Sequence, residues 1–116
     1  MNKLVLSISN DDALLKTRQY ILEHAGFDVV SAWGFSNALN QCENAKFDLV
    51  LLGHTLAPED KTALAKAVRK HCDCPIVSVR RSGQHAKHPE ADYSIGADEG
   101  PEVLVAVVRQ ALGFSN

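Results

Sequence analysis

The chain has no long apolar run, no strong excess of one charge and few cysteines. No stretch approaches the roughly 18 consecutive apolar residues of a membrane span, and the opening residues MNKLVLSISNDD carry no long apolar core or cleavage site of a leader. The formal net charge of −2 does not favour nucleic acid as a partner. Three cysteines, an odd number, do not suggest a disulfide framework. We therefore expect a cytoplasmic protein that binds neither membrane nor nucleic acid.

Motifs of enzymatic chemistry are also missing. The sequence contains no glycine-rich phosphate loop and no local signature of a serine or cysteine nucleophile. His71, Cys72 and Cys74 could contribute to a zinc site, but such sites usually need a second pair of ligands. Only His85 and His88 lie nearby in sequence. We favour structural cysteines at a helix end, and we expect no enzyme activity, no metal and no cofactor.

Short β-rich runs alternate with segments of helical period along the whole chain. A length of 116 residues, with 46% hydrophobic and 22% charged residues, suits one globular domain spanning residues 1–116. Several strand candidates are continuously apolar, which is typical of parallel strands covered on both faces. The predicted strands are residues 4–8, 27–32, 48–52, 75–79 and 92–95.

Helices are predicted at 12–24, at 36–44, from 58 onward and at 101–112, because apolar residues recur there at helical spacing. Residues 80–90 contain Gly83 and Pro89 and lack an apolar stripe, so we expect a loop. Alternating strands and helices imply right-handed crossovers. The predicted fold is a three-layer, doubly wound α/β domain with a five-stranded parallel sheet, in which the helix between strands four and five is shortened or lost.

Four stretches of the sequence resemble the receiver domains of bacterial two-component signalling. They are KLVLSISNDDALLKTRQYILEHAGFDVVSA, FDLVLLGHTLAP, CPIVSV and ADYSIGADEGPEVLVAVVRQAL, and they follow one another in the family's order. The resemblance implies a flavodoxin-like fold of the response-regulator receiver type. It also implies a role in phosphorelay signal transduction, in which an aspartate side chain takes up a phosphoryl group.

The positions that carry this chemistry in the family are changed here. Gly53 stands where the phosphoacceptor aspartate would be, and glycine has no side-chain nucleophile. Ser9 and Asn10 stand where an acidic pair would hold Mg²⁺. Gly96 stands where a lysine would pair with the phosphoryl oxygens. The resemblance therefore implies a degenerate domain, a pseudo-receiver, with these four phosphorylation-site positions altered.

Two positions match the family pattern. Ser78 stands at the hydroxyl that contacts the phosphoryl group, and Tyr93 stands at the aromatic that changes rotamer on activation. We expect a domain that acts through protein–protein interaction, independently of phosphorylation. Receiver relatives bind partners through the last strand, the last helix and the segment before them, and a homodimer through that surface is one such arrangement.

Two other functions stay open. A small ligand could bind at the carboxyl end of the sheet in a pocket lined by Trp33, Ser78 and Tyr93, or the domain could be a purely structural module of a larger assembly. Trp33 could also anchor a partner, although core packing is the simpler interpretation. Arg80 and Arg81 make the following segment basic, which would suit an anionic partner, although a solvated loop is the favoured interpretation.

Three further residues have plain structural interpretations. Asp11 and Asp12 precede or open a helix and are expected to cap it instead of binding a cation. His54 is expected to be a solvated loop residue. A carboxylate at Gly53 would face solvent at the end of a strand, so we expect the fold to tolerate Gly53→Asp.

Overall fold

The computed structural model describes residues 2–81 and 90–114. Within these residues the chain forms five strands and four helices whose bounds agree with the sequence predictions to within two residues. In chain order they are β1 (Leu4–Ser9), α1 (Asp12–His24), β2 (Asp28–Trp33), α2 (Gly34–Asn44), β3 (Leu49–Leu52), α3 (Pro58–His71), β4 (Ile76–Arg80), β5 (Tyr93–Gly96) and α4 (Pro101–Ala111).

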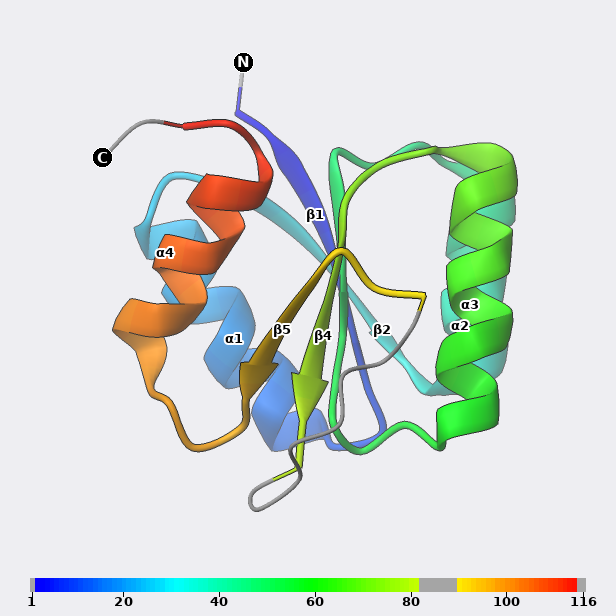
Figure 1. The fold of residues 1–116 in the computed structure, drawn as a ribbon, viewed down its shortest axis with the longest axis horizontal. Helices are drawn as coiled ribbons and strands as arrows, with labels where there is room; N and C mark the ends of the chain where they lie inside the picture. Colours follow the sequence, from blue (N-terminus) through cyan, green and yellow to red (C-terminus); the bar gives the residue numbers. More distant parts are fainter. Residues whose placement is uncertain (1, 82–89, 115–116) are drawn as a thin grey trace.

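All strand pairs are parallel, and the strand order is β2-β1-β3-β4-β5. Helices α1 and α4 cover one face of the sheet and α2 and α3 cover the other (Figure 1). The strand order reverses at β1, so β1 and β3 lie side by side with their crossovers leading in opposite directions. A ligand crevice is expected at this point in doubly wound sheets, outside the carboxyl ends of the strands. The predicted three-layer α/β fold is confirmed.

An apolar core lies on each face of the sheet. Successive strand residues point to opposite faces, so Val5 packs in the core beneath α1 and α4, whereas Leu6 packs in the core beneath α2 and α3. All four residues of Leu49–Leu52 are fully buried, as the continuously apolar run of β3 predicted. At roughly 1.5 to 3 kcal/mol for each fully buried aliphatic side chain, these two cores supply most of the favourable energy of folding.

The helix ends follow the signals in the sequence. The Asp11 carboxylate accepts a hydrogen bond from the Leu14 N–H at 3.2 Å, so Asp11 is the N-cap of α1, as predicted. Asp12 lies in the first turn and forms an ion pair with Lys16 at 3.1 Å. None of the helices among the described residues is both long and apolar enough to cross a membrane.

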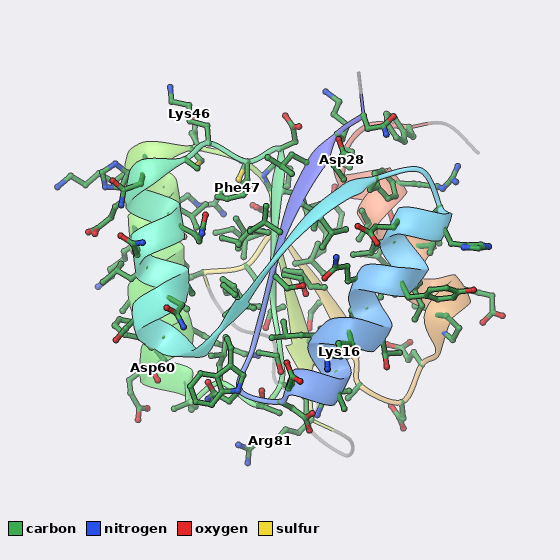
Figure 2. The ribbon with its side chains drawn as sticks, turned by 180° about the vertical axis from the view of Figure 1, so that it is seen from behind. Lys16, Asp28, Lys46, Phe47, Asp60 and Arg81 are labelled. Carbon is green, nitrogen blue, oxygen red and sulfur yellow. The ribbon has the colours of Figure 1, made fainter. Side chains whose placement is uncertain are left out.

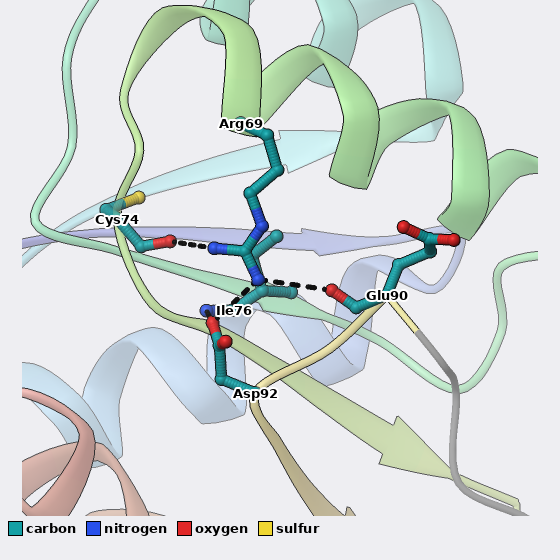
Figure 3. Close-up of polar contacts among 5 residues, drawn as sticks. All are labelled: Arg69, Cys74, Ile76, Glu90 and Asp92. Carbon is teal, nitrogen blue, oxygen red and sulfur yellow. Dashed lines mark hydrogen bonds and ion pairs between the residues drawn. The ribbon is translucent and has the colours of Figure 1, made fainter.

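The connection between β4 and β5 contains no helix in its described residues, 81 and 90–92, and most of the predicted loop lies outside the described residues. Arg69 of α3 anchors the returning chain instead. Its guanidinium donates to the Cys74 and Glu90 carbonyls and to the Asp92 carboxylate (Figure 3). Asp92 also accepts from the Ile76 N–H at 2.8 Å. This network fixes the start of β5 against β4.

Candidate functional site

Three residues of the expected phosphorylation site meet at the carboxyl end of the sheet. Ser9 ends β1, Gly53 follows β3, and Ser78 lies next to Leu52 in β4. All three are buried, with Ser9 and Ser78 at 0% exposure. Figure 2 shows this end of the molecule, with Arg81 below the sheet.

The positions expected to hold a metal are bonded to the loop after β3. The Ser9 and Thr55 hydroxyls lie 2.9 Å apart, and the Ser9 Oγ also accepts from the Asp11 N–H. Asn10 donates from its backbone N–H to Thr55 Oγ1 and from its side-chain amide to the Thr55 carbonyl. The polar atoms at Ser9 and Asn10 thus join β1 to the loop. Thr55 was not singled out from the sequence.

Position 53 favours a glycine because the backbone of β1 passes close by. The Gly53 N–H donates to the Ile8 carbonyl at 2.9 Å, and a Cβ at this position would lie 2.5 Å from that same oxygen. It would also lie 3.0 Å from Nη1 of Arg18. The expectation that Gly53→Asp would be tolerated is therefore wrong, because the first side-chain carbon collides with backbone before the carboxylate reaches solvent.

Arg18 of α1 lies across this position. Only 7% of the residue is exposed. Its Nη2 lies 3.2 Å from His54 Nδ1, whereas Nη1 is buried without a hydrogen-bond partner. Burial lowers the pKa of the Arg18 guanidinium, and the negative charge of Asp11 opposes this effect. The sequence did carry a signal, because Arg18 interrupts the apolar stripe of α1 at a position where a leucine or isoleucine would continue it.

Lys61 of α3 enters the site from the other face of the sheet. The residue is 8% exposed, and its Nζ donates to the Ser78 Oγ at 2.8 Å and to the Val79 carbonyl at 2.7 Å. Burial lowers the pKa of the Lys61 ammonium to about 8, with further contributions from Arg81 and Arg18. Sequence analysis missed Lys61, because nothing in a charged first turn distinguishes an inward lysine from a solvated one.

His54 and Arg81 complete the charged cluster. The Arg81 Nε donates to the His54 carbonyl at 3.2 Å, and Arg81 is exposed. Burial, followed by the charges of Arg18, Lys61 and Arg81, lowers the pKa of the His54 imidazole. His54 is half-buried against Arg18, so the expectation of a solvated loop residue is wrong.

Arg80 turns away from this cluster. Its Nε donates to the Ser94 Oγ at 2.8 Å and its Nη2 lies 3.8 Å from the Glu99 carboxylate. Arg80 therefore binds β5 and the loop that follows it. The expectation of a solvated arginine pair holds for Arg81 only.

Gly96 ends β5 directly across from Arg80. A Cβ at Gly96 would lie 3.0 Å from the Asp98 carboxylate and 3.2 Å from the Glu99 carboxylate. The first side-chain carbon of a lysine at this position would lie between two acidic side chains. Gly96 also lines a cavity of about 180 Å³ between α1 and α4, which Arg18 lines from the opposite side.

Trp33 and Tyr93 do not join the site. Trp33 ends β2 at one edge of the sheet and is 56% exposed, so the expected core packing is wrong. Tyr93 begins β5 at the opposite edge and the opposite end of the sheet, beside Asp73 and Cys74. The two edge strands are about 19 Å apart at normal strand spacing. A single small pocket lined by Trp33, Ser78 and Tyr93 is therefore excluded.

The cysteines show no arrangement for a metal. In the described part of the chain, no group of three or more His, Cys, Asp or Glu side chains is positioned to hold one, and His85 and His88 lie outside it. Burial raises the pKa of the Cys42 thiol to about 11 and that of the Cys74 thiol to about 12. Both thiols are thus protonated at neutral pH and weak nucleophiles.

Comparison with known proteins supports the same fold. No family model matches the chain. The chain is 30% identical over 103 residues to the alkaline phosphatase synthesis transcriptional regulatory protein PhoP of Bacillus subtilis, a match that covers 88% of this chain and 41% of that protein. The chain therefore spans less than half the length of this relative.

Solved structures of response regulators superimpose on almost the whole chain. A CheY-like receiver domain protein from Methanospirillum hungatei has a TM-score of 0.83 at 24% identity, covering 97% of this chain and 94% of its own. A putative response regulator from Chloroflexus aurantiacus has a TM-score of 0.84 at 23% identity, covering 97% and 98%. These likenesses show the flavodoxin-like fold in its CheY-like form.

Proposed function

We propose that this chain, a domain of the response-regulator receiver type, acts by binding a protein in a two-component signalling pathway and not by accepting a phosphoryl group. The observation that carries the proposal is Gly53, which offers no nucleophile and has no space for one. The guanidinium of Arg18 lies beside it, where an active receiver would need room for a phosphoryl group and its metal.

The charge of the site opposes a divalent cation. Mg²⁺ prefers oxygen ligands, carboxylates above all, whereas Arg18 and Lys61 place two buried positive charges at this end of the sheet. Ser9 and Asn10 already bond to Thr55, and Asp11 caps α1. The charge at this end of the sheet is thus opposite in sign to the acidic site that holds Mg²⁺ in the family pattern.

The hydroxyl of Ser78 is held by a donor from the protein itself. In the family pattern this hydroxyl contacts the phosphoryl group, and here it accepts from the Lys61 Nζ. A buried, charge-assisted hydrogen bond of this kind is worth roughly 1.5 to 3 kcal/mol. It supports a domain that keeps one arrangement at this position, without a phosphorylation switch.

For the partner surface we propose β5 and the outer side of α4. β5 is an edge strand. A shallow hollow on the outer side of α4 is lined by Pro101, Glu102, Val105, Ala106 and Arg109, an apolar centre flanked by one acid and one base. Such a mixed surface suits a protein partner better than a polyanion. A homodimer through β5 and α4 is one form this contact could take.

Phosphorylation is tested by incubating the domain with acetyl phosphate and Mg²⁺ and measuring its intact mass. We expect no adduct, while a receiver domain with an intact aspartate, treated in parallel, gains one phosphoryl group. A stoichiometric, hydroxylamine-sensitive adduct on this chain would overturn the proposal.

The partner surface is tested with Val105→Arg, which introduces a charge at the centre of the α4 hollow. We expect this variant to fold normally but to lose the partner that co-purifies with wild type, or to become monomeric if the partner is a second copy. Lys66→Glu, an exposed change on α3 at the other face, is the matched control. Loss of binding in the control and not in Val105→Arg would place the surface elsewhere.

A further inference from the structure

Helix α4 is apolar all the way round at its centre. Residues 103–108 are all valine, leucine or alanine, and they span nearly two helical turns. The inner side of this segment packs on the sheet through Leu104 and Val108, which are buried. On the outer side Val105 is half-buried and Ala106 is exposed. A helix that is apolar on every side is usually covered on every side, so the outer side of α4 has the composition of a contact surface.

No other element of the described chain covers this surface. Figure 1 shows α4 at the outside of the molecule, and the hollow on its outer side is lined by residues of α4 alone. Helix α3 on the opposite face of the sheet is different, because its exposed positions include the charged residues Glu59, Lys66 and Lys70. The outer side of α4 is therefore apolar and open, whereas that of α3 is suited to solvent.

Two opposite charges border the apolar surface, and neither has a charged partner in the described part of the chain. Glu102 is exposed, and the Arg109 Nη2 donates to the Ala25 carbonyl, a neutral acceptor. The ion pairs of the described residues include neither side chain. Glu102 and Arg109 lie two turns apart, about 10 Å along the helix axis, which is too far for them to pair with each other. The midpoint between them falls between Val105 and Ala106.

We propose that α4 pairs with α4 of a second copy of this chain, with the two helices antiparallel about a two-fold axis that passes between Val105 and Ala106. This inference rests on the partner surface proposed above and names its occupant. In this arrangement Glu102 of each copy lies opposite Arg109 of the other, and Val105 of each copy meets the small side chain of Ala106. Both copies use the same surface, as in other isologous two-fold contacts.

The order of the charges favours this arrangement over the alternatives. An antiparallel pair joins the acidic end of one helix to the basic end of the other at both ends of the contact. A parallel pair would place Glu102 beside Glu102 and Arg109 beside Arg109, and like charges repel. A different protein would have to supply the reverse order of charges around an apolar centre. The outer side of α4 supplies that order itself, so it is complementary to its own copy.

The size of the surface indicates a weak dimer. A helix of 11 residues is about 16 Å long and about 10 Å wide. This footprint is well below the roughly 800 Å² that each partner buries in a stable complex, and interfaces of such a size are transient. We therefore expect a dissociation constant in the micromolar range or above. The chain should be monomeric in dilute solution and dimeric when concentrated.

The first test follows self-association by sedimentation velocity from about 10 µM to about 1 mM. Wild type should change from monomer to dimer over this range. Glu102→Arg should weaken the dimer by at least about tenfold, because two attractive contacts become repulsive. Glu59→Arg is the matched control, since it makes the same change in the first turn of α3 on the opposite face. A monomeric wild type at the highest concentration, or equal weakening by Glu59→Arg, would overturn the proposal.

The second test restores the pairing between variants. Arg109→Glu alone should also weaken the dimer, because each copy then brings Glu102 against a second acid. An equimolar mixture of the Glu102→Arg and Arg109→Glu chains should form a heterodimer, since every contact across the axis again joins unlike charges. Recovery in the mixture shows that neither variant lost its dimer by misfolding. A mixture that associates no more tightly than its two components would refute the antiparallel arrangement.

The third measurement uses wild type alone. In a concentrated mixture of ¹³C-labelled and unlabelled chains, isotope-filtered NMR should show contacts between the Val105 methyl groups and the Ala106 methyl group of the second copy. Intermolecular contacts confined to β5 would contradict the pairing of α4. These results are independent of the proposed function, which a phosphoryl adduct would overturn without affecting the dimer. A monomer that still loses another protein on Val105→Arg would overturn the dimer and leave the proposed function in place.

Discussion

The two ends of the sheet treat charged side chains in opposite ways. At the amino end, Arg69 and Asp92 form an ion pair at 2.9 Å, and both also bond to backbone groups (Figure 3). At the carboxyl end, Arg18 and Lys61 are far more buried, yet neither has a carboxylate partner among the described residues. Charge is thus paired where it is exposed and unpaired where it is buried.

This difference separates two ways of holding a charged side chain. The pairing at the amino end holds β5 in place by an ion pair and hydrogen bonds. The cations at the carboxyl end are held by neutral groups instead, Lys61 by Ser78 and Val79 and Arg18 by His54. The comparison therefore predicts that substitutions at the two ends will differ in how stability responds to pH.

The largest effect is expected at Gly53. Gly53→Ala adds a Cβ 2.5 Å from the Ile8 carbonyl oxygen, and the backbone of β1 must move to relieve the contact. We expect a loss of about 3 kcal/mol in the free energy of unfolding, the upper range for overpacking. Urea unfolding followed by circular dichroism measures it. A loss below about 1 kcal/mol would mean that the carboxyl end of β1 is more pliable than the contact indicates.

The second-largest loss of stability is expected at the amino end of the sheet, where Arg69 and Asp92 are paired. Asp92→Ala removes the acceptor of the Ile76 N–H and the partner of Arg69, and should cost about 1 to 2 kcal/mol. Because both side chains of the ion pair are more than one third exposed, the Coulombic share is small. Asp92→Asn keeps an acceptor oxygen and should therefore recover most of the loss. Equal losses in the two variants, again measured by urea unfolding, would show that the charge and not the hydrogen bond fixes β5.

The third effect is a pH dependence caused by Lys61. Its pKa is lowered from 10.5 to about 8 in the folded protein, so between these values the unfolded chain binds more protons than the folded one. Stability from this group therefore rises as pH increases from about 8 to 10.5 and is lowest below pH 8, where the buried ammonium is charged. Lys61→Met should remove this rise, measured by urea unfolding at several pH values.

A matched control is available for Lys61. Lys16→Met removes an exposed lysine of α1 and should leave the alkaline rise of stability intact. If Lys61→Met and wild type respond to pH in parallel, the Lys61 ammonium is better compensated in the folded state than its two hydrogen bonds suggest.

The fold could be predicted from the sequence because its signals are local and repeated. Continuous apolar runs such as Leu49–Leu52 marked parallel strands, and Asp11 and Pro58 marked helix starts. The position of Gly53 after β3 followed from the same spacing. Each of these signals depends only on residues that are close in sequence, so it can be recognised without knowledge of tertiary contacts.

The composition of the site could not be predicted in the same way. Arg18, Lys61 and Thr55 come from separate segments and meet only because the strand order brings the ends of β1, β3 and β4 together. The family resemblance indicates only the positions at which phosphorylation groups would stand. The side chains that occupy this end of the sheet come from other positions of the sequence. The prediction that Trp33 packs in the core was wrong for a different reason. An aromatic residue at a strand end carries no signal that distinguishes core from surface.

The smallest predicted effect belongs to His54. Partial burial, followed by the charges of three cations, lowers its pKa below the ordinary value of 6.5, so below that pH the unfolded chain binds a proton that the folded protein resists. Stability should therefore fall as pH decreases from about 6.5 through the lowered pKa of the folded state. Protonation would also place a donor on Nδ1, which now faces the Arg18 Nη2. His54→Asn, which offers Arg18 an oxygen acceptor without a titrating ring, should reduce this acid-side loss, measured by thermal unfolding between pH 7 and about pH 5.

A matched control is available for His54. His24→Asn changes an exposed histidine that stacks on Tyr20 outside the site, and should leave the acid-side loss of stability as in wild type. Arg18, Lys61 and Arg81 all act on His54, whereas His24 lies outside this cluster, so only the substitution at His54 should alter this loss. An equal reduction in both variants would show that the loss does not come from the cluster of charges at the carboxyl end of the sheet.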